Sequence, residues 1–171
     1  MIRPYLEITP RIAASAWIAP SADVIGDVEI GDGSSIWYAS VVRGDVFPIR
    51  IGARTNVQDH CVLHVTHERH ACILRDDITI GHRVVLHGCT VESRALVGIG
   101  AIVLDRVVIG EGALVAAGAL VTPGTRVPPG MVAMGSPARI VREVTDAERA
   151  WMEESSRNYV LYAQQHATGV R

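Results

Sequence analysis

Residues 91–133 read VESRALVGIGAIVLDRVVIGEGALVAAGALVTPGTRVPPGMVA, and a small or aliphatic side chain recurs at every sixth position. The recurring residues are Val91, Val97, Val103, Ile109, Val115, Val121, Val127 and Ala133. A period of six fits neither the turn of an α-helix nor the alternation of a simple hairpin. It fits a parallel β-helix, in which each hexad supplies one short strand and one corner, and three hexads complete a triangular coil.

The same frame extends back toward the N-terminus with three changes of register. Its earlier positions are Ile12, Ile18, Val24, Ile30, Ile36 and Val42, then Ile51, Val57 and Leu63, then Leu74, Ile80 and Leu86. Ile, Val and Leu are 48 of the 171 residues, so about 5 or 6 of the frame positions would hold one by chance. Of the 20 frame positions, 19 do. The sequence therefore predicts an all-β solenoid of six to seven coils, with one aliphatic side chain of each strand on the axis.

Small residues mark the corners of the predicted coils. Glycine follows the frame residue at Gly31, Gly52, Gly81, Gly98 and Gly110. We expect these glycines to supply the unusual backbone dihedral angles of a tight corner.

The C-terminal segment changes from a period of six to a helical one. Thr145 and Glu148 form a capping-box pattern, which predicts a helix over 145–167. Its apolar face comprises Trp151, Met152, Ser155, Tyr159, Tyr162 and Ala163. We expect this helix to cover the outside of the β-helix or of a neighbouring subunit. The predicted organisation is an N-terminal segment 1–10, a β-helix 11–142 and a C-terminal helix and tail 143–171.

Composition excludes several classes of function. All 16 basic residues are arginine, which rules out lysine-dependent Schiff-base chemistry and a Walker-type phosphate loop. The net charge of −2 without a basic stripe argues against nucleic acid, and no apolar stretch is long enough to predict a membrane span. The three cysteines lack CxxC spacing and the N-terminus lacks a signal-peptide pattern, so we expect a cytoplasmic protein.

Six of the seven histidines lie between His60 and His87. Counting hexads in threes places Arg43, His64 and His87 at equivalent positions of successive coils, so they should form a column. Neighbouring parallel strands are about 4.8 Å apart, and two imidazoles at that spacing can bind one metal ion. Solvated surface histidines are the alternative.

His82 falls on a different face of the predicted prism, around a corner from His64 and His87. It could join them at one metal only if the second face of one subunit packed against the third face of another. Such a contact closes into a ring at a rotation of 120°. The sequence therefore indicates a homotrimer with metal sites built from two chains.

Further polar residues surround this region. Asn56, Gln58 and Asp59 precede the strand of His64, while Arg43 and Asp45 precede the first change of frame. Arg43 and Asp45 could be catalytic or a structural interface pair. Among the cysteines, Cys61 is expected to fill the core, and Cys89 is an alternative metal ligand. A short loop from His67 to Ala71 coincides with the second change of frame and is expected on the binding side.

Three stretches together resemble the γ-class carbonic anhydrase family, above all its short bacterial members. They are VVRGDVFPIRIGARTNVQDHCVLHVTH (41–67), ITIGHRVVLHGCTV (78–91) and GSPARIVR (135–142). The resemblance implies a left-handed parallel β-helix and a homotrimer with Zn²⁺, or alternatively Fe²⁺ or Co²⁺, at each subunit interface. It also implies that His64 and His87 of one subunit and His82 of its neighbour hold the metal.

The resemblance assigns roles to the polar residues as well. Gln58 matches the residue that hydrogen-bonds the metal-bound water, Arg43 and Asp45 match an intersubunit ion pair, and Asn56 and Asp59 match supporting positions. The family's proton-shuttle glutamate is replaced here by His67. His67 or His70 is therefore a candidate proton carrier, and the activity is expected to be low.

We accordingly expect a zinc-dependent lyase that reversibly hydrates CO2 to bicarbonate by a metal-bound hydroxide at the subunit interface. One alternative is an acyltransferase or thioesterase acting on CoA esters, as many hexapeptide-repeat proteins are acyltransferases. Another is a metal-binding scaffold with little or no catalytic activity.

Overall fold

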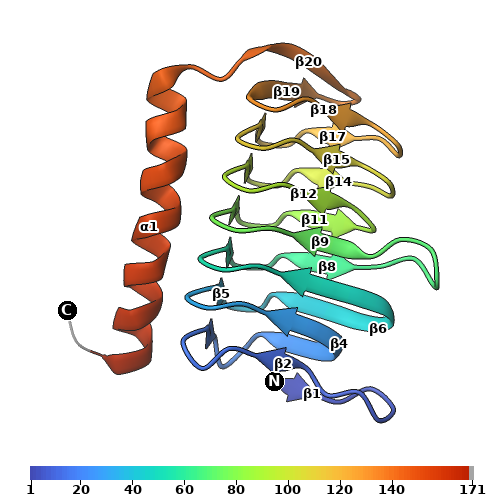
Figure 1. The fold of residues 1–171 in the computed structure, drawn as a ribbon, viewed down its shortest axis with the longest axis vertical. Coiled ribbons are helices and arrows are strands. Elements are labelled where there is room, and N and C mark those ends of the chain that lie inside the picture. The colour runs from blue at the N-terminus through green and yellow to red at the C-terminus, as the bar shows by residue number, and fades with distance from the viewer. Residues whose placement is uncertain (170–171) are drawn as a thin grey trace.

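The computed structural model describes residues 1–169 and is a parallel β-solenoid of about seven coils with one helix, α1 (Asp146–Thr168), beside it (Figure 1). The predicted all-β solenoid with a C-terminal helix is confirmed. The last two residues of the predicted segment 143–171 lie outside the described residues.

Two sheets form the three faces of the prism. The face beside α1 is an eight-stranded sheet in the order β20 (Ala138–Glu143), β19 (Met131–Gly135), β16 (Leu114–Val115), β13 (Leu96–Val97), β10 (Thr79–Ile80), β7 (Asn56–Val57), β5 (Ser35–Ile36) and β3 (Trp17–Ile18). A second face holds β8 (Val62–His64), β11 (Val85–His87), β14 (Ile102–Val103) and β17 (Leu120–Val121). The remaining face holds β2 (Arg11–Ile12), β9 (Cys72–Leu74), β12 (Thr90–Val91), β15 (Val108–Ile109) and β18 (Arg126–Val127).

Long strands join the faces near the N-terminal end. β4 (Asp23–Ile30) pairs with both β1 (Ile2–Arg3) and β2, and β6 (Val41–Ile51) pairs with both β8 and β9. The first change of frame lies within β6, and the second coincides with the loop between β8 and β9. At the other end β20 runs antiparallel to β19, a feature that the repeat does not predict.

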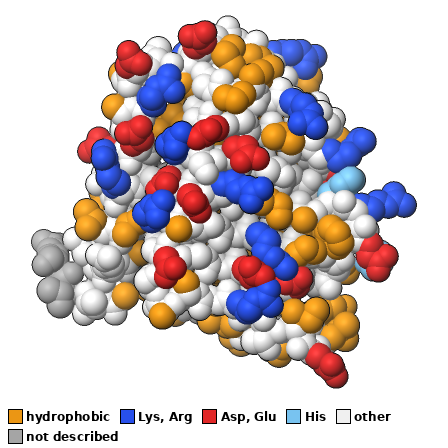
Figure 2. Space-filling view, viewed as in Figure 1, with side chains coloured by type: hydrophobic (Ala, Val, Ile, Leu, Met, Phe, Trp, Pro, Cys, Tyr) orange, Lys and Arg blue, Asp and Glu red, His pale blue; other side chains and the backbone are white. Residues whose placement is uncertain are grey.

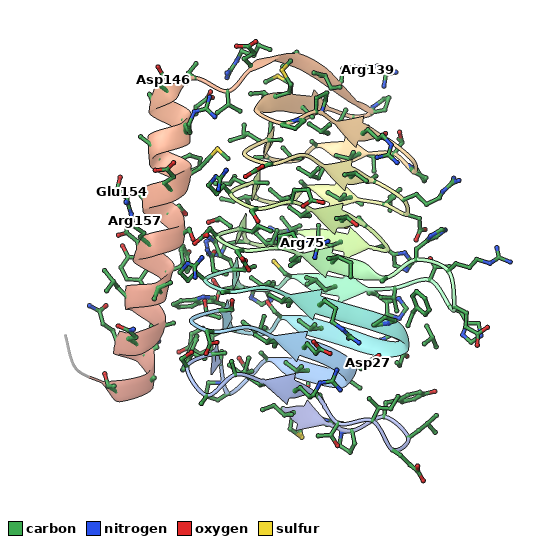
Figure 3. All side chains as sticks on the ribbon, viewed as in Figure 1. Asp27, Arg75, Arg139, Asp146, Glu154 and Arg157 are labelled. Atoms are coloured by element: carbon green, nitrogen blue, oxygen red, sulfur yellow. The ribbon has the colours of Figure 1, made fainter. Side chains whose placement is uncertain are left out.

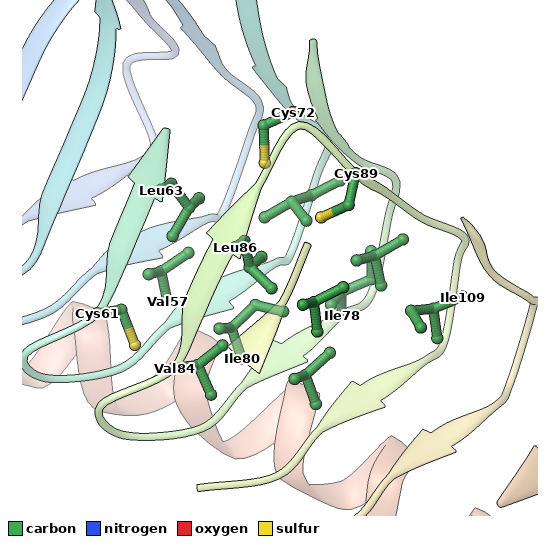
Figure 4. Close-up of a cluster of buried hydrophobic side chains, with 14 of the residues drawn as sticks. Val57, Cys61, Leu63, Cys72, Ile78, Ile80, Val84, Leu86, Cys89 and Ile109 are labelled. Atoms are coloured by element: carbon green, nitrogen blue, oxygen red, sulfur yellow. The ribbon is translucent and has the colours of Figure 1, made fainter. Parts of the chain in front are cut away.

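The frame residues fill the axis of the solenoid (Figure 4). From Val24 to Ala133 each is at most 3% exposed. Ile12 and Ile18 are only partly buried because they belong to the first coil, which has a neighbouring coil on one side only. Burial of one aliphatic side chain per strand therefore accounts for the six-residue period.

The corner glycines have a different role from the one expected. A Cβ added to Gly98 would lie 2.6 Å from the backbone nitrogen of Ala117, and one on Gly110 would lie 2.5 Å from that of Pro129. These glycines allow adjacent coils to approach closely, and their φ angles are not positive. The left-handed conformation occurs two residues later, as at Gly100 with φ 69°.

The helix begins as predicted, because both hydrogen bonds of the Thr145–Glu148 capping box are present. Its contact face is narrower than expected. Met152, Ser156 and Ala163 are buried, whereas Trp151 and Tyr162 are 53% and 43% exposed. A helix on a flat sheet touches it along one stripe, and side chains at the edges of that stripe remain in solvent.

Aromatic rings fasten the far end of α1 to the first coils. Trp37 makes edge contacts with Trp17, Tyr159 and His166, and the hydroxyl of Tyr38 lies 2.9 Å from Nδ1 of His166. α1 thus runs back along the solenoid from β20 toward the N-terminal coils (Figure 1).

The outer surface is charged. Figure 3 shows Glu154 and Arg157 of α1 pointing away from the solenoid, and acidic and basic side chains intermingle over the face in Figure 2. Within residues 1–169, no helix is long and apolar enough to cross a bilayer.

Loss of the helix cap should destabilise the protein. Thr145→Ala removes the hydroxyl that accepts from the backbone N–H of Glu148, and we expect a loss of about 0.5–2 kcal/mol in the free energy of unfolding. Urea denaturation followed by circular dichroism measures it. Gln164→Ala, at an exposed position of the same helix, is the control and should not destabilise. An unchanged midpoint for Thr145→Ala would contradict the role of the cap.

Stability should depend on pH through Glu148. Hydrogen bonds from Arg142 and Thr145 lower the pKa of Glu148 from 4.5 to about 2, so its ionised form stabilises the fold fully above pH 4.5 and this contribution is lost as the pH falls toward 2. We expect Glu148→Gln to lower the melting temperature at neutral pH and this difference to disappear at acidic pH. Glu154→Gln is the control, and a pH-independent difference for Glu148→Gln would refute the linkage.

Candidate metal site

Two imidazoles converge on the face formed by β8 and β11. His64 and His87 end these strands and are paired in register. Nδ1 of His64 lies 3.2 Å from Nε2 of His87. Two nitrogens bound to one tetrahedral zinc ion are about 3.3 Å apart. The pair therefore fits a shared transition-metal ion in both donor type and spacing.

A carboxylate holds the other nitrogen of each ring. Nε2 of His64 lies 3.1 Å from Oδ1 of Asp45, and Nδ1 of His87 lies 3.0 Å from Oδ1 of Asp105. Arg43 donates a hydrogen bond to Asp45 within the same chain. These contacts leave the two facing nitrogens for a ligand.

Burial and charge favour the metal-binding form of His64. Burial lowers the pKa of His64 by more than the hydrogen bond to Asp45 raises it, and the nearby Arg43 lowers it further. Burial works to raise the pKa of Asp45, but hydrogen bonds from Arg43 and His64 outweigh it and the pKa is lowered. The same balance lowers the pKa of Asp105, through Thr66 and His87. A neutral imidazole beside an ionised carboxylate, as at His64 and Asp45, is the form that binds metal.

His82 lies after β10, around the corner from this pair, as the face count predicts. Its Nδ1 is 2.8 Å from Oδ2 of Asp59, and its side chain is 40% exposed. Thus all three candidate histidines have one nitrogen against a carboxylate. Within residues 1–169 of one chain, no three His, Cys, Asp or Glu side chains are placed to hold a metal ion together.

Two buried amides lie on the His82 side. Asn56 donates from Nδ2 to the carbonyl oxygen of Ile78 and to Oγ1 of Thr79, which fixes the orientation of its amide. Its Oδ1 accepts a hydrogen bond from Nε2 of Gln58 at 3.2 Å. Gln58 therefore keeps its Oε1 as an acceptor.

Gln58 and His82 line one pocket of about 510 Å³ between α1 and strands β10, β13 and β16. Most of its other lining side chains are small or apolar, including Leu96, Leu114 and Trp151. The pocket therefore combines an apolar wall with a few polar groups, as small-molecule sites do.

The structure separates the remaining candidates from this cluster. His67 lies in the loop after β8, is 72% exposed and is 3.9 Å from Glu68. Cys61 fills the core as expected, and burial raises its pKa to about 12. The alternative that Cys89 is a metal ligand is wrong, because its side chain is buried in the solenoid core (Figure 4).

Asp105 was missed by the sequence analysis. In the hexad pattern, Asp105 looks the same as any other polar residue at a corner. The available signal was its position one coil beyond His87, opposite Gly88, where a glycine leaves room for a side chain from the next coil.

The chain is similar in sequence to named carbonic anhydrases and in structure to a protein named as an acetyltransferase. No family model matches the chain. It is 51% identical to a carbonic anhydrase of Geobacillus kaustophilus over 94% of this chain and 87% of that protein. It is 50% identical to the mitochondrial gamma carbonic anhydrase 1 of Arabidopsis thaliana over 92% of this chain, and spans 59% of that protein's length. A solved Bacillus cereus structure, named as a presumed acetyltransferase, matches with a TM-score of 0.95 and 48% identity, over 97% of this chain and 96% of that one.

Proposed function

This chain belongs to the γ-class carbonic anhydrase family, and we propose that it reversibly hydrates CO2 to bicarbonate at a zinc site shared between subunits of a homotrimer. The observation that carries the proposal is the 3.2 Å separation of the facing nitrogens of His64 and His87. Each ring is held by a carboxylate, an arrangement typical of histidine ligands to zinc.

His64 and His87 of one subunit and His82 of the next would hold the metal. A zinc ion bound by three histidines lowers the pKa of water to about 7 and so supplies hydroxide at neutral pH; Fe²⁺ or Co²⁺ would suit the same donors. Asp45 and Asp59 would fix the orientation of His64 and His82.

Gln58 orients the attacking oxygen. Because its Nε2 donates to Asn56, its free Oε1 would accept a hydrogen bond from the attacking water or hydroxide and direct the oxygen lone pair toward CO2. The apolar wall of the adjoining pocket accommodates CO2 itself. His67 remains the candidate proton carrier, because its imidazole is exposed to solvent on the loop that follows the strand of His64.

Exposed apolar side chains beside the His64–His87 pair and beside His82 support the homotrimer. On the His64–His87 face Val62 and Ile102 are 41% and 39% exposed, and Ile99, one coil beyond His82, is 55% exposed. A contact between these two faces in neighbouring copies would bury all three and bring His82 to the pair. The cytoplasm is the compartment we propose, since the three cysteines are free thiols inside the fold.

A second candidate function is acyl transfer or thioester hydrolysis on CoA esters. The pocket beside His82, at about 510 Å³, is larger than CO2 requires, and it could admit part of a pantetheine arm. This function needs one catalytic histidine and no metal. A metal-binding scaffold without catalysis is the third candidate.

Metal content and CO2 hydration decide among these functions. We expect purified protein to carry about one transition metal per chain and to hydrate CO2 in stopped-flow assays, loaded with zinc or, anaerobically, with iron. His64→Ala should lose both properties. His60→Ala, at an exposed corner, is the matched control and should keep both. Metal without hydration would favour the scaffold, and the absence of both with turnover of a CoA ester would favour acyl transfer.

Mixed trimers test whether the site is shared. Homotrimers of His82→Ala and of His87→Ala should each lack every complete site. When the two variants are co-expressed and the mixed trimers purified, one interface in each should pair intact His64 and His87 with an intact His82 from the neighbour. We expect metal binding and activity to return in part. No recovery in verified mixed trimers would contradict a site built from two chains.

A further inference from the structure

Asp105 joins His87 to a second polar side chain from a different coil. Its Oδ1 accepts a hydrogen bond from Oγ1 of Thr66 at 2.6 Å and lies 3.0 Å from Nδ1 of His87. Thr66 follows β8, His87 ends β11 and Asp105 follows β14, so three successive coils contribute. Thr66 and His87 therefore converge on the same carboxylate oxygen.

Gly88 makes this approach sterically feasible. A Cβ at this position would lie 2.2 Å from Oδ1 of Asp105 and 2.8 Å from Cβ of His70. Gly88 also adopts a positive φ of 53°, and its carbonyl oxygen accepts from the backbone N–H of Arg106. The backbone next to His87 is therefore shaped around the Asp105 carboxylate.

We propose that Asp105 is a positioning residue for His87, which it holds in the tautomer protonated at Nδ1 so that the lone pair of Nε2 faces His64. The inference rests on the proposed metal site. A carboxylate accepts but cannot donate, so a hydrogen bond to Asp105 requires the proton on Nδ1. Thr66 holds the carboxylate in place.

A surface ion pair would have different consequences. An exposed pair contributes little and does not select a tautomer. The chain offers a control in Arg54 and Asp77, whose bidentate contacts of 2.6 and 2.7 Å involve no histidine. If Asp105 were only a surface partner, Asp105→Asn and Asp77→Asn would have equivalent effects on metal binding.

The test compares zinc affinity in the full-length protein by competition with a chromogenic chelator. We expect Asp105→Asn to lose about 10–100-fold in affinity, because the asparagine amide can donate to Nδ1 and select the wrong tautomer. Thr66→Val should lose less, and Asp77→Asn should match the wild type. The visible spectrum of the Co²⁺ form should change in Asp105→Asn and should not change in Asp77→Asn. Wild-type affinity in Asp105→Asn would overturn the proposal.

Nitrogen NMR of the histidine rings in metal-free protein, at a pH where imidazole is neutral, tests the tautomer directly. We expect His87 to carry its proton on Nδ1 in the wild type and in Asp77→Asn, and to shift toward Nε2 in Asp105→Asn. An unchanged tautomer in Asp105→Asn would overturn the role of Asp105. A wild type that binds no zinc would instead contradict the proposed function, and the NMR result would still decide whether Asp105 positions His87.

Discussion

Parallel pairing of successive coils is the constraint on which the candidate site depends. Burial of one aliphatic side chain of each strand on the axis fixes the register between neighbouring coils. The register in turn determines which residue of the next coil lies beside each residue that follows the buried one. His64 and His87 are 23 residues apart in sequence, yet the register that pairs Leu63 with Leu86 sets the two imidazoles next to each other. The site is thus a consequence of core packing: the hydrophobic frame supplies the geometry, and the polar residues need only occupy the correct positions along it.

The same constraint explains why His82 lies apart from His64 and His87 within one chain. Strands of a triangular coil meet at corners, so side chains on two faces of one prism diverge. His82 follows β10 and His64 ends β8, on different faces. A flat contact between prisms reverses this divergence, because it brings one face of a copy against another face of its neighbour. Val62 and Ile102 beside the His64–His87 pair and Ile99 beside His82 are exposed apolar side chains, and the contact proposed above would bury them.

The sequence predicts those features that repeat with the hexad and misses those that depend on contacts between coils. The buried frame, the pairing of His64 with His87 and the capping box of the helix follow from spacing, and the structure confirms each. The function of the corner glycines does not follow from spacing. It depends on how closely the backbone of the next coil approaches, and the sequence pattern does not contain that distance. The antiparallel strand β20 and the role of Asp105 escape prediction for the same reason. Each depends on where a particular side chain or terminal segment meets its neighbour rather than on the repeat.

The charges around His64 affect both the orientation of its imidazole and its protonation state. A carboxylate beside an imidazole fixes its orientation, but an isolated carboxylate also favours the protonated ring, which cannot bind metal. Arg43 resolves this conflict by pairing with Asp45, since its positive charge stabilises the ionised carboxylate and at the same time disfavours a second positive charge on His64. Burial is the largest cause of the lowered pKa of His64, and the charge of Arg43 lowers it further. Burial works to raise the pKa of Asp45, but hydrogen bonds from Arg43 and His64 outweigh it, so that pKa is lowered as well. Arg43 therefore acts on the imidazole through Asp45 and through its own positive charge, and together with burial it favours the neutral form of an oriented His64.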